Sequence, residues 1–153
     1  MRALLIVDMQ KGFMKNNDYW VLSDRISNLV NNGGYDKVIF TKFINDNTKN
    51  SLFVDKLGWH GLQSKEEQDF SFLLPQNAIV FNKYGYGLGE DCLQYIANLH
   101  IDEMDLCGVE SEACVCAIAF QLWDRGIYPN ILKDYVLGNV EMDDVFAKQF
   151  GCK

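Results

Sequence analysis

The chain has 153 residues, of which 48% are hydrophobic and 23% are charged, as expected for an ordinary globular domain. Its formal net charge of −7 argues against nucleic acid as a partner, because phosphate binding requires clustered lysines and arginines. No apolar run approaches the roughly 18 residues of a membrane span, and the N-terminal run ends in Asp8 without a small-residue cleavage site, so we expect neither a membrane partner nor a signal peptide.

Short apolar runs alternate with segments of helical periodicity along the chain. The expected strands are residues 3–7, 38–40, 79–81, 104–107 and 130–132. The expected helices are residues 20–30, 89–100, 112–125 and 140–150. Residues 45–74 are long and irregular, which is typical of a functional loop or of a plain surface insertion. Strands separated by helices predict an α/β fold, in which one domain over residues 1–153 has a parallel sheet between two helical layers.

Three polar positions follow the ends of expected strands. Asp8 follows the first strand, Lys83 the third, and the turn that leads to Cys114 the fourth. In open parallel sheets, ligands bind beyond these carboxyl ends, near the switch in strand order. With the order 3-2-1-4-5, Asp8 and the Cys114 turn lie on neighbouring strands about 5 Å apart. Lys83 starts roughly 10 Å away, and the glycines that follow it let its loop bend inward.

Cys114 falls in the first turn of an expected apolar helix, for which Ser111 is a favourable N-cap. At that position the helix dipole and unpaired amides should lower the pKa of the thiol, and the same amides could stabilise an oxyanion. Asp8 could accept the thiol proton, and Lys83 could keep Asp8 ionised. Taken singly, each residue also has a structural interpretation as a buried cysteine, a turn aspartate or a solvated lysine. Their placement on one edge of the sheet favours a nucleophilic site.

The five cysteines are an odd number and include no Cys-x-x-Cys pair, which argues against a disulfide framework or a zinc site. They fit a reducing, cytoplasmic setting. We expect Cys92, Cys107 and Cys116 to act as small buried hydrophobic residues.

Several segments, in chain order, resemble the isochorismatase-like cysteine hydrolases, a family that includes nicotinamidases and carbamoylsarcosine-type amidohydrolases. The matching segments are residues 4–13, 81–86, 106–115, 124–126 and 133–134. The resemblance implies a catalytic triad of Asp8, Lys83 and Cys114. It also implies a cis peptide bond between Val109 and Glu110, where the backbone as far as Ala113 would surround the oxyanion.

The resemblance further implies a hydrolase that cleaves a C–N bond of a small amide, ureide or carbamoyl compound through a thioester on Cys114. Nicotinamidases bind a metal through an Asp-x-His signature after the second strand, but here Phe43 and Asn45 occupy the corresponding positions, so we expect no metal and no cofactor. True isochorismatases commonly lack the cysteine, and its presence favours C–N hydrolysis. Members of the family are frequently homo-oligomers, and a sixth strand usually follows the point that corresponds to Lys153, so that edge could be shortened or completed by a partner subunit.

Aromatic residues could form a wall around a flat substrate, although such residues are more often plain core. The candidates are Phe13, Trp20, Trp59, Tyr84 and Tyr86. His60 and His100 are better explained by structural roles. Two further classes of function stay open: a silent family member that binds a metabolite or a partner protein, and a thiol-redox protein in which Cys107 or Cys116 resolves an oxidised Cys114.

Overall fold

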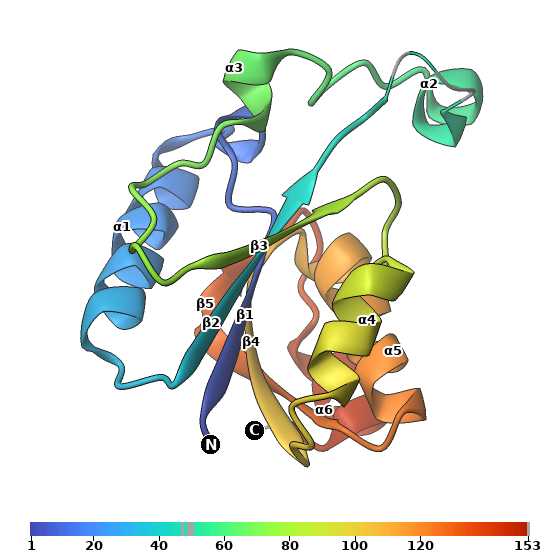
Figure 1. The fold of residues 1–153 in the computed structure, drawn as a ribbon. Helices are drawn as coiled ribbons and strands as arrows, with labels where there is room; N and C mark the ends of the chain where they lie inside the picture. The colour runs from blue at the N-terminus through green and yellow to red at the C-terminus, as the bar shows by residue number, and fades with distance from the viewer. Residues whose placement is uncertain (47, 49–50, 153) are drawn as a thin grey trace.

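A computed structural model describes residues 1–46, 48 and 51–152. Its five strands form one sheet in the order β3-β2-β1-β4-β5, and every pairing is parallel (Figure 1). The strands are β1 (Ala3–Val7), β2 (Lys37–Phe43), β3 (Ile79–Lys83), β4 (Glu103–Val109) and β5 (Tyr128–Leu137). The predicted fold class and strand order are therefore confirmed.

The described part of the chain also contains six α-helices and two short helical turns, of which all but α6 lie between strands. The α-helices are α1 (Asn17–Asn32), α2 (Leu52–Leu57), α3 (Lys65–Gln68), α4 (Glu90–Ala97), α5 (Cys116–Asp124) and α6 (Asp143–Phe150). The turns are the 3-10 helix η1 (Lys11–Phe13) and the π-helix η2 (Ser111–Val115). None of the described helices has the length and apolar character needed to cross a lipid bilayer.

The central strand β1 is buried along its whole length, because helices cover both faces of the sheet. Leu4 and Ile6 belong to the core cluster beneath α1, whereas Leu5 and Val7 belong to the cluster beneath α4, α5 and α6. Figure 1 shows α1 on one side of the sheet and α4, α5 and α6 on the other. The period-two alternation of a strand thus accounts for the continuous apolar run in the sequence.

Two expectations about the elements need correction. The irregular stretch at residues 45–74 contains the short helices α2 and α3. The expected helix over residues 112–125 is divided into η2 and α5, because the amide of Val115 donates to the carbonyl of Glu110, one residue beyond the α-helical partner. This extra residue lies in the turn that carries Cys114.

Candidate active site

Three strand ends bring together a carboxylate, an ammonium and a thiol at the carboxyl edge of the sheet. Asp8 follows β1, Lys83 ends β3, and Cys114 lies in η2 after β4. The Lys83 Nζ atom is 3.1 Å from Asp8 Oδ2 and 3.2 Å from Cys114 Sγ. The exposed fractions of the three residues are 0% for Asp8, 2% for Lys83 and 7% for Cys114. The three side chains are therefore largely shielded from solvent, and their charges interact more strongly than they would in water.

Lys83 reaches the site because the loop after β3 bends inward. Its ammonium group donates to the carbonyl oxygens of Gly85, at 2.6 Å, and Tyr86, at 3.2 Å. The ammonium also lies 4.9 Å from the centre of the Phe43 ring. Burial lowers the pKa of Lys83, but the charge of Asp8, followed by the interactions with Cys114, outweighs that effect and leaves the pKa raised. Lys83 is therefore a fixed cation in the resting site.

Asp8 is held by a residue that the sequence analysis did not identify. Thr41, on the neighbouring strand β2, donates to Asp8 Oδ1 at 2.6 Å and accepts from the Asp8 amide at 3.0 Å. The backbone φ of Asp8 is 53°, in the left-handed region that residues other than glycine seldom occupy. A polar residue inside an otherwise apolar strand was the available signal for Thr41. The second oxygen of Asp8, Oδ2, is thereby directed at the Lys83 ammonium.

Cys114 is positioned by the Glu110 carbonyl, which accepts hydrogen bonds from the amides of Ala113, at 3.1 Å, and Val115, at 3.2 Å. Glu110, and not Ser111, occupies the N-cap position, so the expected Ser111 cap is wrong. Burial, followed by the charge of Asp8, raises the pKa of the Cys114 thiol to about 12, although Lys83 opposes the shift. The expected lowering of this pKa is also wrong, because burial outweighs the helix terminus. The resting group is a thiol.

The backbone before Cys114 has two unusual features. The peptide bond between Val109 and Glu110 is cis. Gly108 has a φ of 118°, and a Cβ atom at this position would overlap the carbonyl oxygen of Val7 on β1. Only glycine therefore allows β4 to approach β1 this closely just before the Cys114 turn.

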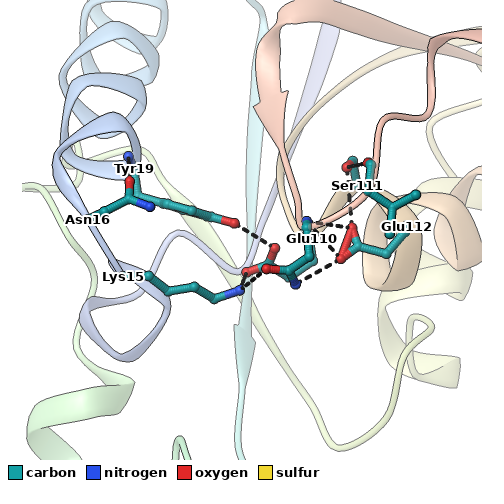
Figure 2. A network of polar contacts seen from close by, with 8 residues as sticks. Lys15, Asn16, Tyr19, Glu110, Ser111 and Glu112 are labelled. Carbon is teal, nitrogen blue, oxygen red and sulfur yellow. Dashed lines mark hydrogen bonds and ion pairs between the residues drawn. The ribbon is translucent and has the colours of Figure 1, made fainter.

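A network of polar contacts surrounds the Glu110 side chain (Figure 2). Tyr19 of α1 donates from its hydroxyl to Glu110 Oε2 at 2.8 Å, and the Lys15 ammonium lies 3.0 Å from Oε1. Lys15 also donates to Asn139 Oδ1 at 2.8 Å, and Asn139 in turn donates to Glu112. Local sequence patterns gave no signal for these contacts, since their partners are far apart in the chain. The network joins α1, the Cys114 turn and the loop after β5.

A cavity of about 250 Å³ opens onto Cys114. Its apolar wall is formed by Phe13, Phe43, Phe53, Leu57, Trp59 and Tyr86, and its polar residues are Lys15, Glu110 and Asn139. Phe13, Phe43 and Trp59 contact one another, with ring-centre distances of 6.1 Å from Trp59 to Phe13, 5.8 Å from Trp59 to Phe43 and 6.3 Å from Phe13 to Phe43. The cavity is thus suited to a flat substrate.

Two of the five expected aromatic residues do not line this cavity. Tyr84 lines a neighbouring hollow of about 560 Å³, to which Tyr86 and Phe53 also contribute. Trp20 is exposed on α1 and lines neither hollow. The expectation is therefore wrong for Trp20, because its position on α1 turns it away from the Cys114 turn, and Tyr84 is displaced to the adjacent surface.

The residues at the metal-binding positions of nicotinamidases do not fit a metal here. Phe43 packs its ring in the cavity wall. The Asn45 side-chain amide is fully engaged by the following loop. It donates to the carbonyl oxygens of Trp59 and Gly61 and accepts from the Ser51 hydroxyl. Within the described residues, no group of three or more histidine, cysteine or acidic side chains is arranged to hold a metal ion. At these two positions Phe43 therefore takes part in apolar packing, and the Asn45 side chain is bonded to the loop that follows it.

Comparisons with solved structures show the same fold. The chain is similar to N-carbamoylsarcosine amidase from Thermoplasma acidophilum, with 16% identity over 100% of this chain and 95% of that chain and a TM-score of 0.80. It is similar to nicotinamidase/pyrazinamidase from Bacillus subtilis, with 18% identity, coverage of 100% and 98%, and a TM-score of 0.84. It is also similar to pyrazinamidase of Pyrococcus horikoshii in complex with zinc, with 22% identity, coverage of 97% and 92%, and a TM-score of 0.75.

The sequence matches none of the curated proteins with which it was compared. A family model described as the isochorismatase domain matches residues 2–144. This match covers nearly the whole chain and includes all three residues that meet at the end of the sheet. The chain therefore belongs to the isochorismatase family of hydrolases.

Proposed function

We propose that the chain is a metal-independent cysteine hydrolase that cleaves the C–N bond of a small amide, ureide or carbamoyl compound. The observation that carries the proposal is the contact of one ammonium with both a carboxylate and a thiol at a cavity. Lys83 lies 3.1 Å from Asp8 and 3.2 Å from Cys114, and Cys114 lines a cavity with an aromatic wall. All three similar structures described above carry the names of amidases, which agrees with this reaction class.

The raised pKa of Cys114 defines the first step of the proposed reaction. Because the resting sulfur is protonated, a base must remove its proton, and we assign this role to Asp8, which contacts the same Lys83 ammonium as the thiol. The thiolate then adds to the carbonyl carbon, and backbone N–H groups at the start of η2 stabilise the oxyanion. The Ala113 amide already donates to Glu110, so it would share its hydrogen bond with the oxyanion.

The second half of the reaction returns the proton and releases both products. Asp8 gives the proton to the departing nitrogen, so that an amine or ammonia leaves and a thioester remains on Cys114. Asp8 then removes a proton from water, which attacks the thioester, and the acid product leaves as the thiol is restored. Lys83 contacts both Asp8 and Cys114, so its positive charge stabilises the thiolate when Asp8 has taken the proton.

The test is a screen of primary amides, ureides and carbamoyl compounds for ammonia release. Wild type is compared with Cys114→Ala and with the matched control Cys116→Ala, which removes a partly exposed thiol two residues away. We expect turnover to be lost only in Cys114→Ala, and a covalent acyl adduct on Cys114 to be seen by mass spectrometry after rapid quenching. Full turnover in Cys114→Ala would refute the proposal.

The position of Cys107 argues against a redox role in which Cys107 resolves an oxidised Cys114. Cys107 is fully buried in the core cluster beneath α1, whereas Cys114 belongs to the cluster on the opposite face of the sheet. All five cysteines are free. We infer that the protein works with reduced thiols, as in the cytoplasm.

We also infer that the chain forms a homo-oligomer. Phe120 and Trp123 of α5 are 42% and 49% exposed, which supports an apolar contact surface on this helix. Light scattering coupled to size-exclusion chromatography tests this inference, and a monomer at micromolar concentration would refute it.

A further inference from the structure

The polar side of the Cys114 cavity contains a lysine that the proposed reaction does not use. Lys15 lies between η1 and α1, lines the cavity, and has a side chain that is 41% exposed. Its ammonium has two oxygen partners in the described part of the chain, Glu110 Oε1 at 3.0 Å and Asn139 Oδ1 at 2.8 Å. The ammonium also lies 5.3 Å from the centre of the Tyr19 ring. An ammonium has three N–H groups, and the two oxygens engage two of them, so Lys15 has the capacity to bind one further acceptor.

The position of this ammonium is fixed by buried groups. The Glu110 side chain is only 10% exposed, and Tyr19, itself buried in α1, donates to its second oxygen. On the other side, the Asn139 side-chain and backbone amides donate to Glu112, which fixes the oxygen that Lys15 contacts. A flexible lysine held in this way is prepared to bind a ligand before the ligand arrives.

Two charges of opposite sign border the cavity here, and their accessibility decides which one a ligand meets. The Oε1 atom of Glu110 is buried and has Lys15 in front of it. The Lys15 side chain is the more exposed member of the pair, at 41% against 10% for Glu110. A ligand group on this side of the cavity therefore contacts the cation, and the carboxylate lies one contact further away.

We propose that Lys15 is a specificity-determining residue that binds a carboxylate or carbonyl oxygen of the substrate. This inference rests on the proposed function and narrows its substrate class. The substrate is an amide with a flat body that packs against Phe13 and Trp59 and that carries an acceptor group, preferably anionic, apart from the bond that Cys114 attacks. Glu110 and Asn139 act as positioning residues for the Lys15 ammonium.

The test compares two probes of the same flat shape and opposite charge, benzoate and benzamidinium. Their dissociation constants are measured by isothermal titration calorimetry at 150 mM salt, which screens distant surface charges. Protection of Cys114 from alkylation at pH 9 shows whether each probe occupies this cavity. The variants are Lys15→Met, the charge-retaining Lys15→Arg, and the control Lys11→Met, which removes the same charge from an exposed residue that does not line the cavity.

We expect wild type to bind benzoate at least about tenfold more tightly than benzamidinium, as for a charge-assisted hydrogen bond. Lys15→Met should lose that preference, Lys15→Arg should keep most of it, and Lys11→Met should change it by less than about twofold. Three results would overturn the inference: a preference for benzamidinium that Glu110→Gln removes, equal losses in both Met variants, or no protection of Cys114 by either probe.

Probe binding requires no turnover, so the two proposals fail separately. If no amide released ammonia, the hydrolase proposal would be refuted while the binding comparison would remain valid. If turnover depended on Cys114 but the probe preference were the same in wild type and Lys15→Met, only the role of Lys15 would be refuted.

Discussion

Replacement of Lys83 by methionine tests whether the buried ion pair controls the site. Both charged side chains are almost completely buried, at 1% for Lys83 and 0% for Asp8, and the two atoms are 3.1 Å apart. At this distance the attraction is about 5 kcal/mol with an effective dielectric constant of 20. Lys83→Met retains the length of the side chain but leaves the Asp8 carboxylate without its cation. Loss of one partner of a buried pair costs about 3–5 kcal/mol.

The assay is urea unfolding at pH 7, followed by tryptophan fluorescence. For a chain of 153 residues, a loss of about 3–5 kcal/mol in the free energy of unfolding would appear in a thermal melt as a decrease in Tm of roughly 10–15 °C. Because the damage comes from the uncompensated carboxylate, adding Asp8→Asn to Lys83→Met should restore at least about 2 kcal/mol of the free energy of unfolding. The two single variants and the double variant together form a double-mutant cycle.

Lys133→Met is the matched control for this experiment. Lys133 also pairs with an aspartate, Asp143, at 3.2 Å, but the two side chains are 59% and 46% exposed. Solvent screens such a pair, so the urea midpoint should not change measurably. The reasoning would be refuted if Lys83→Met behaved like Lys133→Met, or if the effects of Lys83→Met and Asp8→Asn were simply additive.

Three other predictions concern the thiol, the carboxylate and the backbone. Because burial raises the pKa of Cys114 from its ordinary value near 9 to about 12, iodoacetamide labelling of the unliganded protein should still accelerate above pH 9, and a plateau near pH 7 would contradict the burial argument. Thr41→Val should lower kcat in the ammonia-release assay by about tenfold or more, because Asp8 loses a buried hydrogen bond. Thr41→Ser keeps the hydroxyl and should retain most activity. Equal activity in the two variants would exclude an orienting role for Thr41. Gly108→Ala should lower the free energy of unfolding, measured in urea, by about 3 kcal/mol or more. Gly85→Ala, where a Cβ meets no atom within 4 Å, should lower it by about 1 kcal/mol or less. Similar losses in the two variants would contradict the close approach of β4 to β1.

The sheet could be predicted from the sequence because its strands are short apolar runs bounded by turns. The run that precedes Asp8 is continuous, as a strand buried on both faces requires, whereas the run that precedes Gly108 is apolar except for Asp105. Parallel strands end at one edge, so residues directly after them converge once the strand order is known. This rule was sufficient to group Asp8, Lys83 and Cys114.

The remaining contacts of the site depend on packing that local patterns do not contain. Tyr19 and Glu110 are 91 residues apart, and Lys15 and Asn139 are 124 residues apart, so neither pair produces a periodic signal. The direction of the Cys114 pKa shift was missed for a similar reason. The sequence locates a helix start, whose dipole favours the thiolate, but the burial of the sulfur depends on how neighbouring segments fold over it.

The place of β1 at the centre of the sheet also affects biosynthesis. Asp8 leaves the ribosome early, whereas the turn with Cys114 is synthesised only after β4, the second neighbour of β1. Until β4 pairs, the nascent chain presents one open edge of its most apolar strand, a surface to which chaperones and other unfinished chains can bind. The Cys114 sulfur thus meets Asp8 only when the last unprotected side of that strand is closed, so an unfinished polypeptide has not yet brought these side chains together.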